Sequence, residues 1–573
     1  MRNNILVLLL GLSFSAACSQ GDTQRAASPQ KPSPIAKVET GNISKTASPP
    51  QSVQSLKVAN ICLGKDMKAT AAAAEAAKLI MARHLLSDCN RLGDFLTTTS
   101  EIDLSGLGLS DLSILAFSQS LKKLNLNDNR LTSLEALRPL IGLQNLTVER
   151  NQVVDISPLA VLTNLSELGL SGNSIAELSA ISDLTRLSVL QLSRNRITDL
   201  RALTKLTSLR ILSAHSNDIV SISPLAGMTE LRFFNVQGNS EITDFTVLSK
   251  LSKLQNLDIQ GTGARDLSFL APLSELQELK LTSILITNYD AIGSLTKLIS
   301  FEIDAGAALF PAQKPLDPML LAKNTGMQKL ILINQGVSDL NFLTTMPTLK
   351  SLTINFSPLT GTEALKTLKE LVQFSCSNCA LSHVEFLANM PKLEILELGS
   401  NPIVDHSPIG GLTQLHALGL YDTDLKDVSF VAKLPLLEDL ILGTNEIADV
   451  NALAALAKLK RLDLSSNKIT DISSLANKEE LSVLDIGSNS VSSVGVLKTS
   501  PKLVNLDVSN NVSLRHAELL SSPSLEFLDV RKTGLTDCAV LSDLVKLREL
   551  VMAQNELSQI NCLAKMSQLT LLN

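Results

Sequence analysis

The sequence predicts a solenoid that carries a long parallel β-sheet, and three observations predict it. Asparagine recurs every 22 residues between Asn129 and Asn239. Each of these asparagines closes an apolar run of the form Leu121-x-x-Leu124-x-Leu126. The same register continues, with substitutes at the Asn position, from Leu107 to Asn555 and gives about 21 repeats. A short fixed period is typical of repeat proteins, whose units bury their apolar faces by stacking on one another.

The Leu-x-Leu pair of each repeat predicts a short strand, because residues two apart on a strand point to the same face. Successive strands are expected to pair in parallel, about 4.8 Å apart, and to form one concave sheet. The segment after each asparagine, such as 152–159, is short and contains proline, so we expect turns or 3₁₀ segments on the convex side. Aspartates that favour Asx turns there are Asp155, Asp199, Asp405, Asp449 and Asp471.

The repeated asparagine is expected to point inward, where its amide needs hydrogen bonds to the backbone of its own turn and of the neighbouring coil. Cys379 and the threonine substitutes meet part of this demand. Ile284 and Gly306 do not, so we expect irregular coils around them.

The full pattern, Leu-x-x-Leu-x-Leu-x-x-Asn-x-Ile-x-x-Ile-x-x-Leu-x-x-Leu, resembles the 22-residue class of leucine-rich repeats in bacterial internalin-like proteins and in a phosphatase regulatory subunit. The resemblance covers about residues 101–573. It implies a leucine-rich repeat solenoid of the α/β type, which binds a protein partner through its concave sheet and performs no catalysis. That family binds many unrelated proteins, so the resemblance does not identify the partner.

The repeat pattern is irregular at two places, a long step between two repeats and a partial repeat at residues 569–573. The step from Gly306 to Gln335 is 29 residues, and the insertion near 307–328 contains prolines. We expect a projecting loop and a kink in the sheet there, with a merely tolerated insertion as the alternative. The segment Leu569–Asn573 begins a further repeat and is expected to present an unpaired strand edge, a candidate for self-association.

Residues 1–17 have the form of a signal peptide, with a basic start, an apolar run at 5–12 and small residues before Cys18. The run is too short to remain in a membrane as a span. The segment resembles a bacterial lipoprotein signal, which implies lipidation of Cys18 and membrane contact through the lipid. Ser15 stands where leucine is usual, so ordinary secretory cleavage is the alternative. Ser19 resembles the residue that directs lipoproteins to the outer membrane.

The next two segments are not repeats. Residues 18–58 are rich in Ser, Pro and Gln and predict a disordered tether, or a tail without mechanical use. Residues 59–100 predict a helical cap over the first coil of the solenoid. Its Ala-rich stretch 68–81 favours a helix that Asp66 could cap.

Six cysteines follow Cys18 and suit an extracytoplasmic, oxidising location in a bacterial cell envelope. The spacing makes Cys62 with Cys89, and Cys538 with Cys562, candidate disulfides. Cys376 and Cys379 fall on inward positions of one repeat. Extended spacing would place their Cα atoms about 10 Å apart, so we expect free core thiols there.

Composition and motifs argue against catalysis and nucleic-acid binding. The net charge is -6, which does not favour a nucleic-acid surface. The chain contains no G-x-S-x-G, Walker or H-E-x-x-H motif, and its six histidines are scattered. We therefore expect no enzyme activity, no cofactor and no metal site.

An acidic ladder is the main candidate for a binding site. Four residues before the Asn position, the C-terminal repeats carry Asp463, Asp485, Asp507 and Asp529, whereas the N-terminal repeats carry mostly uncharged residues. We expect these carboxylates to point to solvent and to attract a basic partner, although Leu-Asp-Leu-Ser is also a common spelling of this repeat. Residues expected beside the ladder, of types that anchor interfaces, are Tyr421, Arg461, Phe527 and Arg531.

The sequence thus favours an extracytoplasmic protein-binding scaffold, anchored by lipid in the cell envelope. The alternative is a structural envelope protein that acts by self-association through the C-terminal strand edge.

Overall fold

The computed structural model describes residues 53–66, 70–282, 286–304, 315–521 and 524–573. The expected signal peptide, Cys18 and the tether up to residue 52 lie outside these residues, as do Ile284, Gly306 and the start of the insertion. Among the described helices, none has both the length and the apolar character that crossing a membrane requires.

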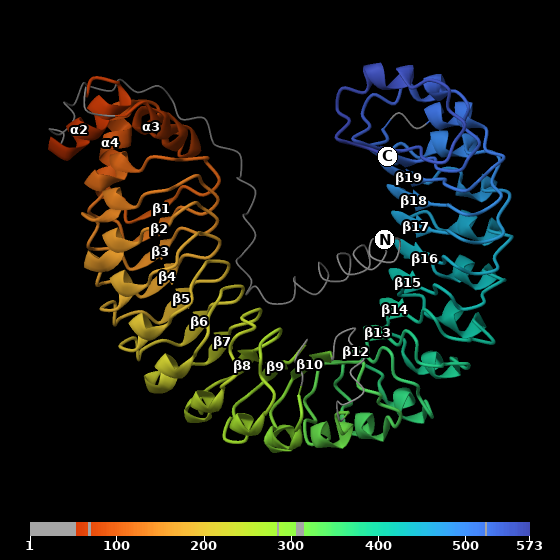
Figure 1. Ribbon diagram of the computed structural model, residues 1–573, viewed down its shortest axis with the longest axis horizontal. Coiled ribbons are helices and arrows are strands. Elements are labelled where there is room, and N and C mark those ends of the chain that lie inside the picture. Colours follow the sequence, from red (N-terminus) through yellow and green to blue (C-terminus); the bar gives the residue numbers. More distant parts are fainter. Residues whose placement is uncertain (1–52, 67–69, 283–285, 305–314, 522–523) are drawn as a thin grey trace, which may run out of the picture. The chain divides into compact units, whose positions relative to one another are not determined.

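One parallel sheet of 22 strands runs through the unit formed by residues 52–573. Its strands line the inner side of a curved solenoid, and 3₁₀ segments from η1 (Ser113–Phe117) to η21 (Asn561–Lys565) lie on the outer side (Figure 1). The strands are β1 (Glu101–Asp103), β2 (Lys123–Asn125), β3 (Asn145–Thr147), β4 (Glu167–Gly169), β5 (Val189–Gln191), β6 (Ile211–Ser213), β7 (Phe233–Asn235), β8 (Asn256–Asp258), β9 (Glu278–Lys280), β10 (Ser300–Asp304), β11 (Lys329–Ile333), β12 (Ser351–Thr353), β13 (Gln373–Ser375), β14 (Ile395–Glu397), β15 (Ala417–Gly419), β16 (Asp439–Ile441), β17 (Arg461–Asp463), β18 (Val483–Asp485), β19 (Asn505–Asp507), β20 (Phe527–Asp529), β21 (Glu549–Val551) and β22 (Leu571–Leu572). The predicted fold class is confirmed.

The register of the sheet follows the repeat period. Each strand pairs with the next in sequence, as when Leu124 of β2 lies beside Leu146 of β3. Because partners sit one repeat apart, the same position of every repeat forms a row across the sheet. Three rows face the concave side, and we call them the first, second and third concave positions, which lie six, four and two residues before the Asn position.

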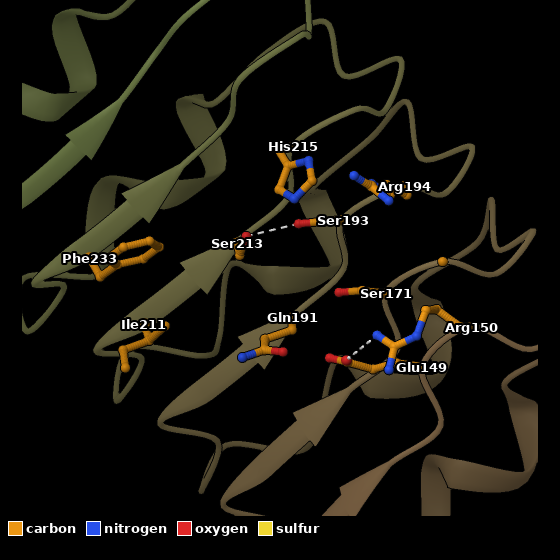
Figure 2. Close-up of a pocket in the computed structure, with 11 residues that line it drawn as sticks. Glu149, Arg150, Ser171, Gln191, Ser193, Arg194, Ile211, Ser213, His215 and Phe233 are labelled. Atoms are coloured by element: carbon orange, nitrogen blue, oxygen red, sulfur yellow. Dashed lines mark hydrogen bonds and ion pairs between the residues drawn. The ribbon is translucent and has the colours of Figure 1, made fainter. Parts of the chain in front are cut away.

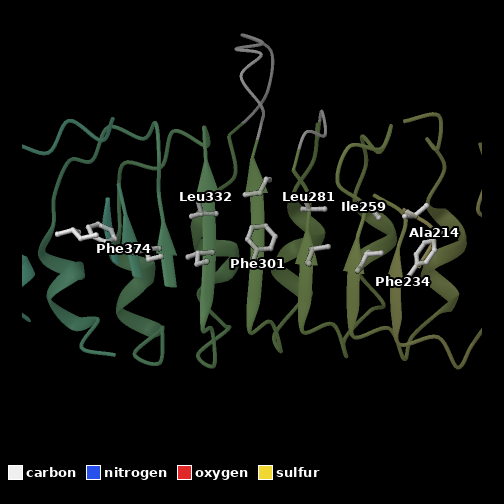
Figure 3. Close-up of a cluster of buried hydrophobic side chains, with 14 of the residues drawn as sticks. Ala214, Phe234, Ile259, Leu281, Phe301, Leu332 and Phe374 are labelled. Carbon is white, nitrogen blue, oxygen red and sulfur yellow. The ribbon is translucent and has the colours of Figure 1, made fainter. Parts of the chain in front are cut away.

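The second residue of each strand from β1 to β21 points into the core. Phe234, Leu279, Phe301 and Leu330 of β7, β9, β10 and β11 are each 0% exposed. Figure 3 shows how buried side chains from successive coils, Phe301 and Leu332 among them, form one continuous apolar layer. A few of these inward residues are phenylalanines. Their rings are buried because each coil stacks on its neighbours, so the core extends along the whole solenoid.

The asparagine ladder makes the hydrogen bonds that the sequence demands. Nδ2 of Asn195 donates to Leu170 O of the preceding coil at 3.0 Å and to Leu192 O of its own turn at 2.9 Å. Oδ1 accepts from Ile175 N at 3.0 Å. A threonine satisfies part of this set, as Thr262 Oγ1 donates to Ile259 O at 2.7 Å. This expectation is confirmed.

The turns on the other side also follow the prediction. Ser157 N donates to Asp155 Oδ1 at 2.8 Å, which closes an Asx turn before the 3₁₀ segment. The same bond forms at the other predicted aspartates, Asp199, Asp405, Asp449 and Asp471.

The helices at the start of the unit are α2 (Val53–Cys62), α3 (Ala71–Arg83) and α4 (Cys89–Thr98). Their apolar sides join the solenoid core through residues such as Ile80 and Leu96. A disulfide joins Cys62 to Cys89, the pair that the sequence suggested.

Two details of the cap prediction are wrong. Helix α2 begins at Val53, so residues 53–58 belong to the cap and not to the tether. Thr70 caps α3 by accepting a hydrogen bond from Ala73 N at 2.9 Å, a role the sequence assigned to Asp66. Thr70 has the extended backbone that an N-cap requires, and it lies directly before the helix.

At the insertion, where we expected a kink in the sheet, the strand pairing is uninterrupted, which agrees with the alternative of a tolerated insertion. Strands β10 and β11 pair over five residues, from Ser300↔Lys329 to Asp304↔Ile333, while β9 and β12 pair with three residues each. The added residues therefore leave the strand order intact. Residues 305–314, where we expected the projecting loop, lie outside the described residues.

The cysteines of the repeats form two further disulfides. Cys538 and Cys562 are joined, with Cα atoms 5.6 Å apart on successive coils. Cys376 and Cys379 are also joined, which corrects the expectation of free thiols. Their Cα atoms are 5.7 Å apart, because the strand ends at Ser375 and Asn378 adopts a left-handed φ of 56°. The chain between them is a turn and not an extended segment.

Candidate binding surface

The four aspartates of the predicted ladder occupy the second concave position of β17 to β20. The sheet register places Asp463 beside Asp485, Asp485 beside Asp507, and Asp507 beside Asp529. Adjacent parallel strands lie about 4.8 Å apart, so the four carboxylates form a row of like charges.

The ladder is less exposed than the sequence suggested, which corrects that expectation. Asp463 is 7% exposed and Asp529 is 2% exposed, while Asp485 and Asp507 are half-buried. Each carboxylate folds back over its own turn and accepts a backbone N–H two residues later, as from Gly487 N to Asp485 Oδ1 at 2.8 Å.

Small residues at the third concave position let the carboxylates pack in this way. A Cβ atom added to Gly487 would lie 3.0 Å from Asp507 Oδ1 and 3.2 Å from Asp485 Oδ1. A larger residue at position 487 would therefore take the space that the carboxylates of Asp485 and Asp507 occupy.

Packing the carboxylates together disfavours their charged forms, and this raises the pKa values of Asp485 and Asp507 in the middle of the ladder. Burial raises the pKa of Asp485 to about 8, with a further contribution from Asp507 and Asp463. Burial and the charge of Asp529 raise the pKa of Asp507 to about 6. Burial also raises the pKa of Asp463. Desolvation and like charges both favour the protonated acid, so Asp485 and Asp507 bind protons at a much higher pH than a free aspartate does.

The four cationic and aromatic candidates differ in how close they lie to the ladder. Arg531 forms an ion pair with Asp529, which raises the pKa of the guanidinium. Arg461 Nε lies 3.8 Å from Asp439 Oδ1 on the neighbouring strand and so does not pair with the ladder. Phe527 is half-buried beside Asn505 of β19. Tyr421 follows β15, so one further strand, β16, separates its coil from β17.

A pocket on the N-terminal half of the concave face was missed by the sequence analysis. Its volume is about 440 Å³, and Figure 2 shows polar side chains pointing into it from β5, β6 and the turns that follow the strands. The pocket is lined by Glu149, Arg150, Ser171, Gly172, Gln191, Ser193, Arg194, Ile211, Ser213, His215 and Phe233.

Polar contacts organise much of this pocket. The hydroxyls of Ser193 and Ser213 lie 2.8 Å apart, and Arg150 Nη1 lies 3.4 Å from Glu149 Oε2. Burial, and next the charge of Arg194, lowers the pKa of His215. Within the described parts of the chain, the Arg194 guanidinium forms no ion pair and no hydrogen bond. The pocket thus combines one unpaired cation, hydroxyl groups and the apolar side chains of Ile211 and Phe233.

The sequence held a signal for this pocket that we did not use. Glu149, Ser171, Ser193 and His215 stand 22 residues apart at the third concave position. At the second concave position of the same coils, residues such as Gly169 and Ser213 give no sign of a pocket. The pocket forms at the third position because two short side chains, Ser171 and Ser193, lie between the longer ones of Glu149 and His215.

Comparisons with known proteins agree with this architecture. A family model described as "Leucine Rich repeats (2 copies)" matches residues 163–205. No curated protein matches the chain by sequence. Among solved structures, the ectodomain of the receptor kinase GASSHO1/SCHENGEN3 from Arabidopsis thaliana has 18% identity and a TM-score of 0.55, over 83% of this chain and 70% of that chain.

Two bacterial structures are also similar. A leucine-rich repeat protein from Leptospira interrogans shares 22% identity over 66% of this chain and 92% of that chain, with a TM-score of 0.48. An internalin from Listeria monocytogenes shares 24% identity over 74% of this chain and 85% of that chain, with a TM-score of 0.24. The strand register, the asparagine ladder and the similarity to the plant ectodomain all indicate the same fold. The chain has the fold of a leucine-rich repeat solenoid.

Proposed function

We propose that the chain is an extracytoplasmic, non-enzymatic scaffold, anchored in a bacterial cell envelope through lipid on Cys18, that binds a basic segment of a protein partner on the C-terminal half of its concave face. The observation that carries this proposal is the row of four aspartates in register on β17 to β20. A basic partner offsets both their mutual repulsion and their desolvation.

The compartment is supported by the cysteines and by the N-terminal sequence. Three disulfides join the six cysteines beyond Cys18, and structural disulfides persist in oxidising compartments. Cys18→Ala is expected to move the protein from the membrane fraction of its host cells to the soluble fraction. A wild-type protein that already fractionates as soluble would contradict the lipid anchor.

The ladder is tested by replacing Asp485 and Asp507 together with asparagine. Asparagine keeps an oxygen that accepts the backbone N–H but removes the charge, so the variant is expected to fold. Binding of an oligolysine peptide, followed by fluorescence anisotropy, should weaken by about tenfold or more, with a shallower dependence on salt.

A matched control removes charge from the same coils outside the concave face. Glu480→Gln with Lys502→Gln deletes an ion pair whose atoms are 2.7 Å apart, and it should leave peptide binding unchanged. If the double asparagine variant binds the peptide as tightly as the wild type at every salt concentration, the ladder is not the binding site.

The alternative role, a structural envelope protein that self-associates, has a specific observation in its favour. Leu571 and Leu572 of β22 are 50% and 48% exposed, an apolar pair that a second copy could cover. Light scattering distinguishes the two roles. A wild-type oligomer that Leu571→Glu and Leu572→Glu convert to a monomer would favour assembly.

A further inference from the structure

Glu397 occupies an unusual place on the concave face. It ends β14 at the second concave position, and its neighbour in the register is Gly419 of β15. A Cβ atom at Gly419 would overlap the Glu397 carboxylate, so this carboxylate lies across the backbone of β15. Glycine at position 419 leaves the space that this carboxylate occupies, and a side chain there would displace the glutamate.

The surroundings of Glu397 are small and apolar. The adjacent strands contribute Ala417, which is 8% exposed, and Ile441. At the third concave position, Gly399 and Gly443 border Tyr421 on either side. The carboxylate thus stands on a floor of glycine and alanine with a tyrosine beside it.

Within the described residues, the Glu397 side chain has no hydrogen bond and no ion pair. Glutamate at the same position of another strand behaves differently. Glu302 of β10 accepts from Gln260 Nε2 at 2.9 Å and lies 3.7 Å from Lys329 Nζ. Glu397 is also partly exposed, and its oxygens are not among the fully buried polar atoms that lack a partner. A ligand atom can therefore reach the carboxylate from the concave side.

We propose that Glu397 is the receptor for one cationic side chain, a lysine or an arginine, of the basic partner. This inference rests on the proposed function and adds a specific contact to it. The carboxylate supplies the charge, and the glycine residues leave room for the alkyl stem of the side chain. Tyr421 is on the coil next to Glu397, with its backbone and Cβ beside Gly399, and an aromatic side chain can add a cation–π contact.

The spacing fits a single extended basic segment. Glu397 and Asp463 share the second concave position and lie three strands apart, which is about 14 Å at 4.8 Å per strand. An extended peptide rises about 3.3 Å per residue, so cations about four residues apart would reach both carboxylates.

The protonation state of Glu397 makes the contact measurable. Burial, and next the charge of Asp439, raises the pKa of Glu397 to about 8. The other charged group nearby is Arg461 beside Asp439, and β13 contributes only uncharged residues, Gln373 and Ser375. At neutral pH the free carboxyl group therefore holds a proton. A bound cation favours the carboxylate, so binding must release that proton to solvent.

The test measures proton release when oligolysine or oligoarginine binds the full chain. Calorimetric titrations at pH 7 in buffers of different ionisation enthalpy should show proton release for the wild type. Glu397→Gln should reduce that release by about one proton and weaken binding by about tenfold. Glu302→Gln is the matched control, since Glu302 has partners of its own, and it should change neither quantity. The peptide that loses more affinity in Glu397→Gln identifies the preferred cation.

A second variant tests the geometry without removing the carboxylate. Gly419→Ala should push Glu397 toward solvent, lower its pKa and so reduce proton release at pH 7 while the charge remains. Thermal melts establish that each variant is folded.

The outcomes separate this inference from the proposed function. If Glu397→Gln keeps both the affinity and the proton release of the wild type while the ladder variant loses binding, the basic-partner proposal stands and the Glu397 assignment is overturned. If neither peptide binds the wild type, both are overturned. If Glu397→Gln releases about one proton fewer than the wild type and Glu302→Gln does not, the Glu397 assignment is supported.

Discussion

Two regions of the same coils treat charge in opposite ways. Just before the strands, residues one repeat apart form pairs of opposite sign. Glu438 lies 2.6 Å from Lys460, and Glu480 lies 2.7 Å from Lys502. The 22-residue register therefore brings acids and bases of neighbouring coils together wherever the sequence places them in one row.

On the concave face of those coils, the same register stacks aspartate on aspartate. Asp463 and Asp485 have no lysine or arginine above or below them in the second concave position, and their pKa values are raised. The 22-residue repeat therefore does not by itself place like charges side by side, because the residues just before the strands of the same coils form pairs of opposite charge. The aspartate ladder is therefore the surface where an external cation would offset the most charge repulsion and desolvation.

The largest expected effect is the pH dependence of stability. Asp485 has an ordinary pKa of 3.8 and a folded-state pKa of about 8, and Asp507 has a folded-state pKa of about 6. Between the unfolded and folded values, the folded state holds a proton that the unfolded state has lost. Stability must therefore fall as pH rises through this window, with a slope of about 1.4 kcal/mol per pH unit for each group.

Replacing both groups with asparagine should flatten this dependence. We expect the free energy of urea unfolding of the wild type to fall between about pH 4 and pH 8. The double variant should lose less over the same window, and Glu397, whose pKa is also raised to about 8, should account for much of the dependence that remains. At pH 8 the variant should be the more stable protein, by a few kcal/mol. Equal slopes for the two proteins would show that the ladder is already neutralised from within the chain.

A smaller effect is expected from Arg531, the cation that pairs with the last aspartate of the ladder. Arg531→Leu would leave Asp529, which is 2% exposed, with a backbone N–H but no counter-charge. Breaking a buried pair in this way is costly, but the Arg531 side chain is 30% exposed, so we expect a loss of about 2 kcal/mol.

Arg461→Leu is the matched control for that measurement. Its guanidinium lies 3.8 Å from Asp439, whose side chain is 39% exposed, so the loss should be clearly smaller. Chemical unfolding at pH 7 compares the two variants. Similar losses would mean that the ladder is no more sensitive to counter-charge than the rest of the concave face.

The features that the sequence predicted are those that repeat. The Leu-x-Leu pairs set the strands, and each asparagine meets a backbone demand that recurs in every coil, so the pattern alone predicts Asn195 bonding to Leu170 O. The Asx turn at Asp155 is equally local.

The features that the sequence did not predict depend on curvature or on single turns. Asp485 is half-buried because small residues such as Gly487 let each carboxylate fold back over its own turn, which the alternation of inward and outward residues alone does not reveal. Cys376 meets Cys379 because the residue before each Asn position, here Asn378, has a left-handed backbone. The Glu397 contact with Gly419 joins two coils and is invisible within either one.

The smallest expected effect belongs to the paired row that opened the comparison. Lys502 and Glu480 are 58% and 44% exposed, so water screens their attraction and their ordering costs side-chain entropy. Replacing both with glutamine should change the free energy of unfolding only slightly, and high salt should remove the difference. Urea unfolding at low and high ionic strength measures both quantities. A larger, salt-independent loss would mean that the paired row supports the coils that carry the ladder, and the two regions could no longer be treated as separate.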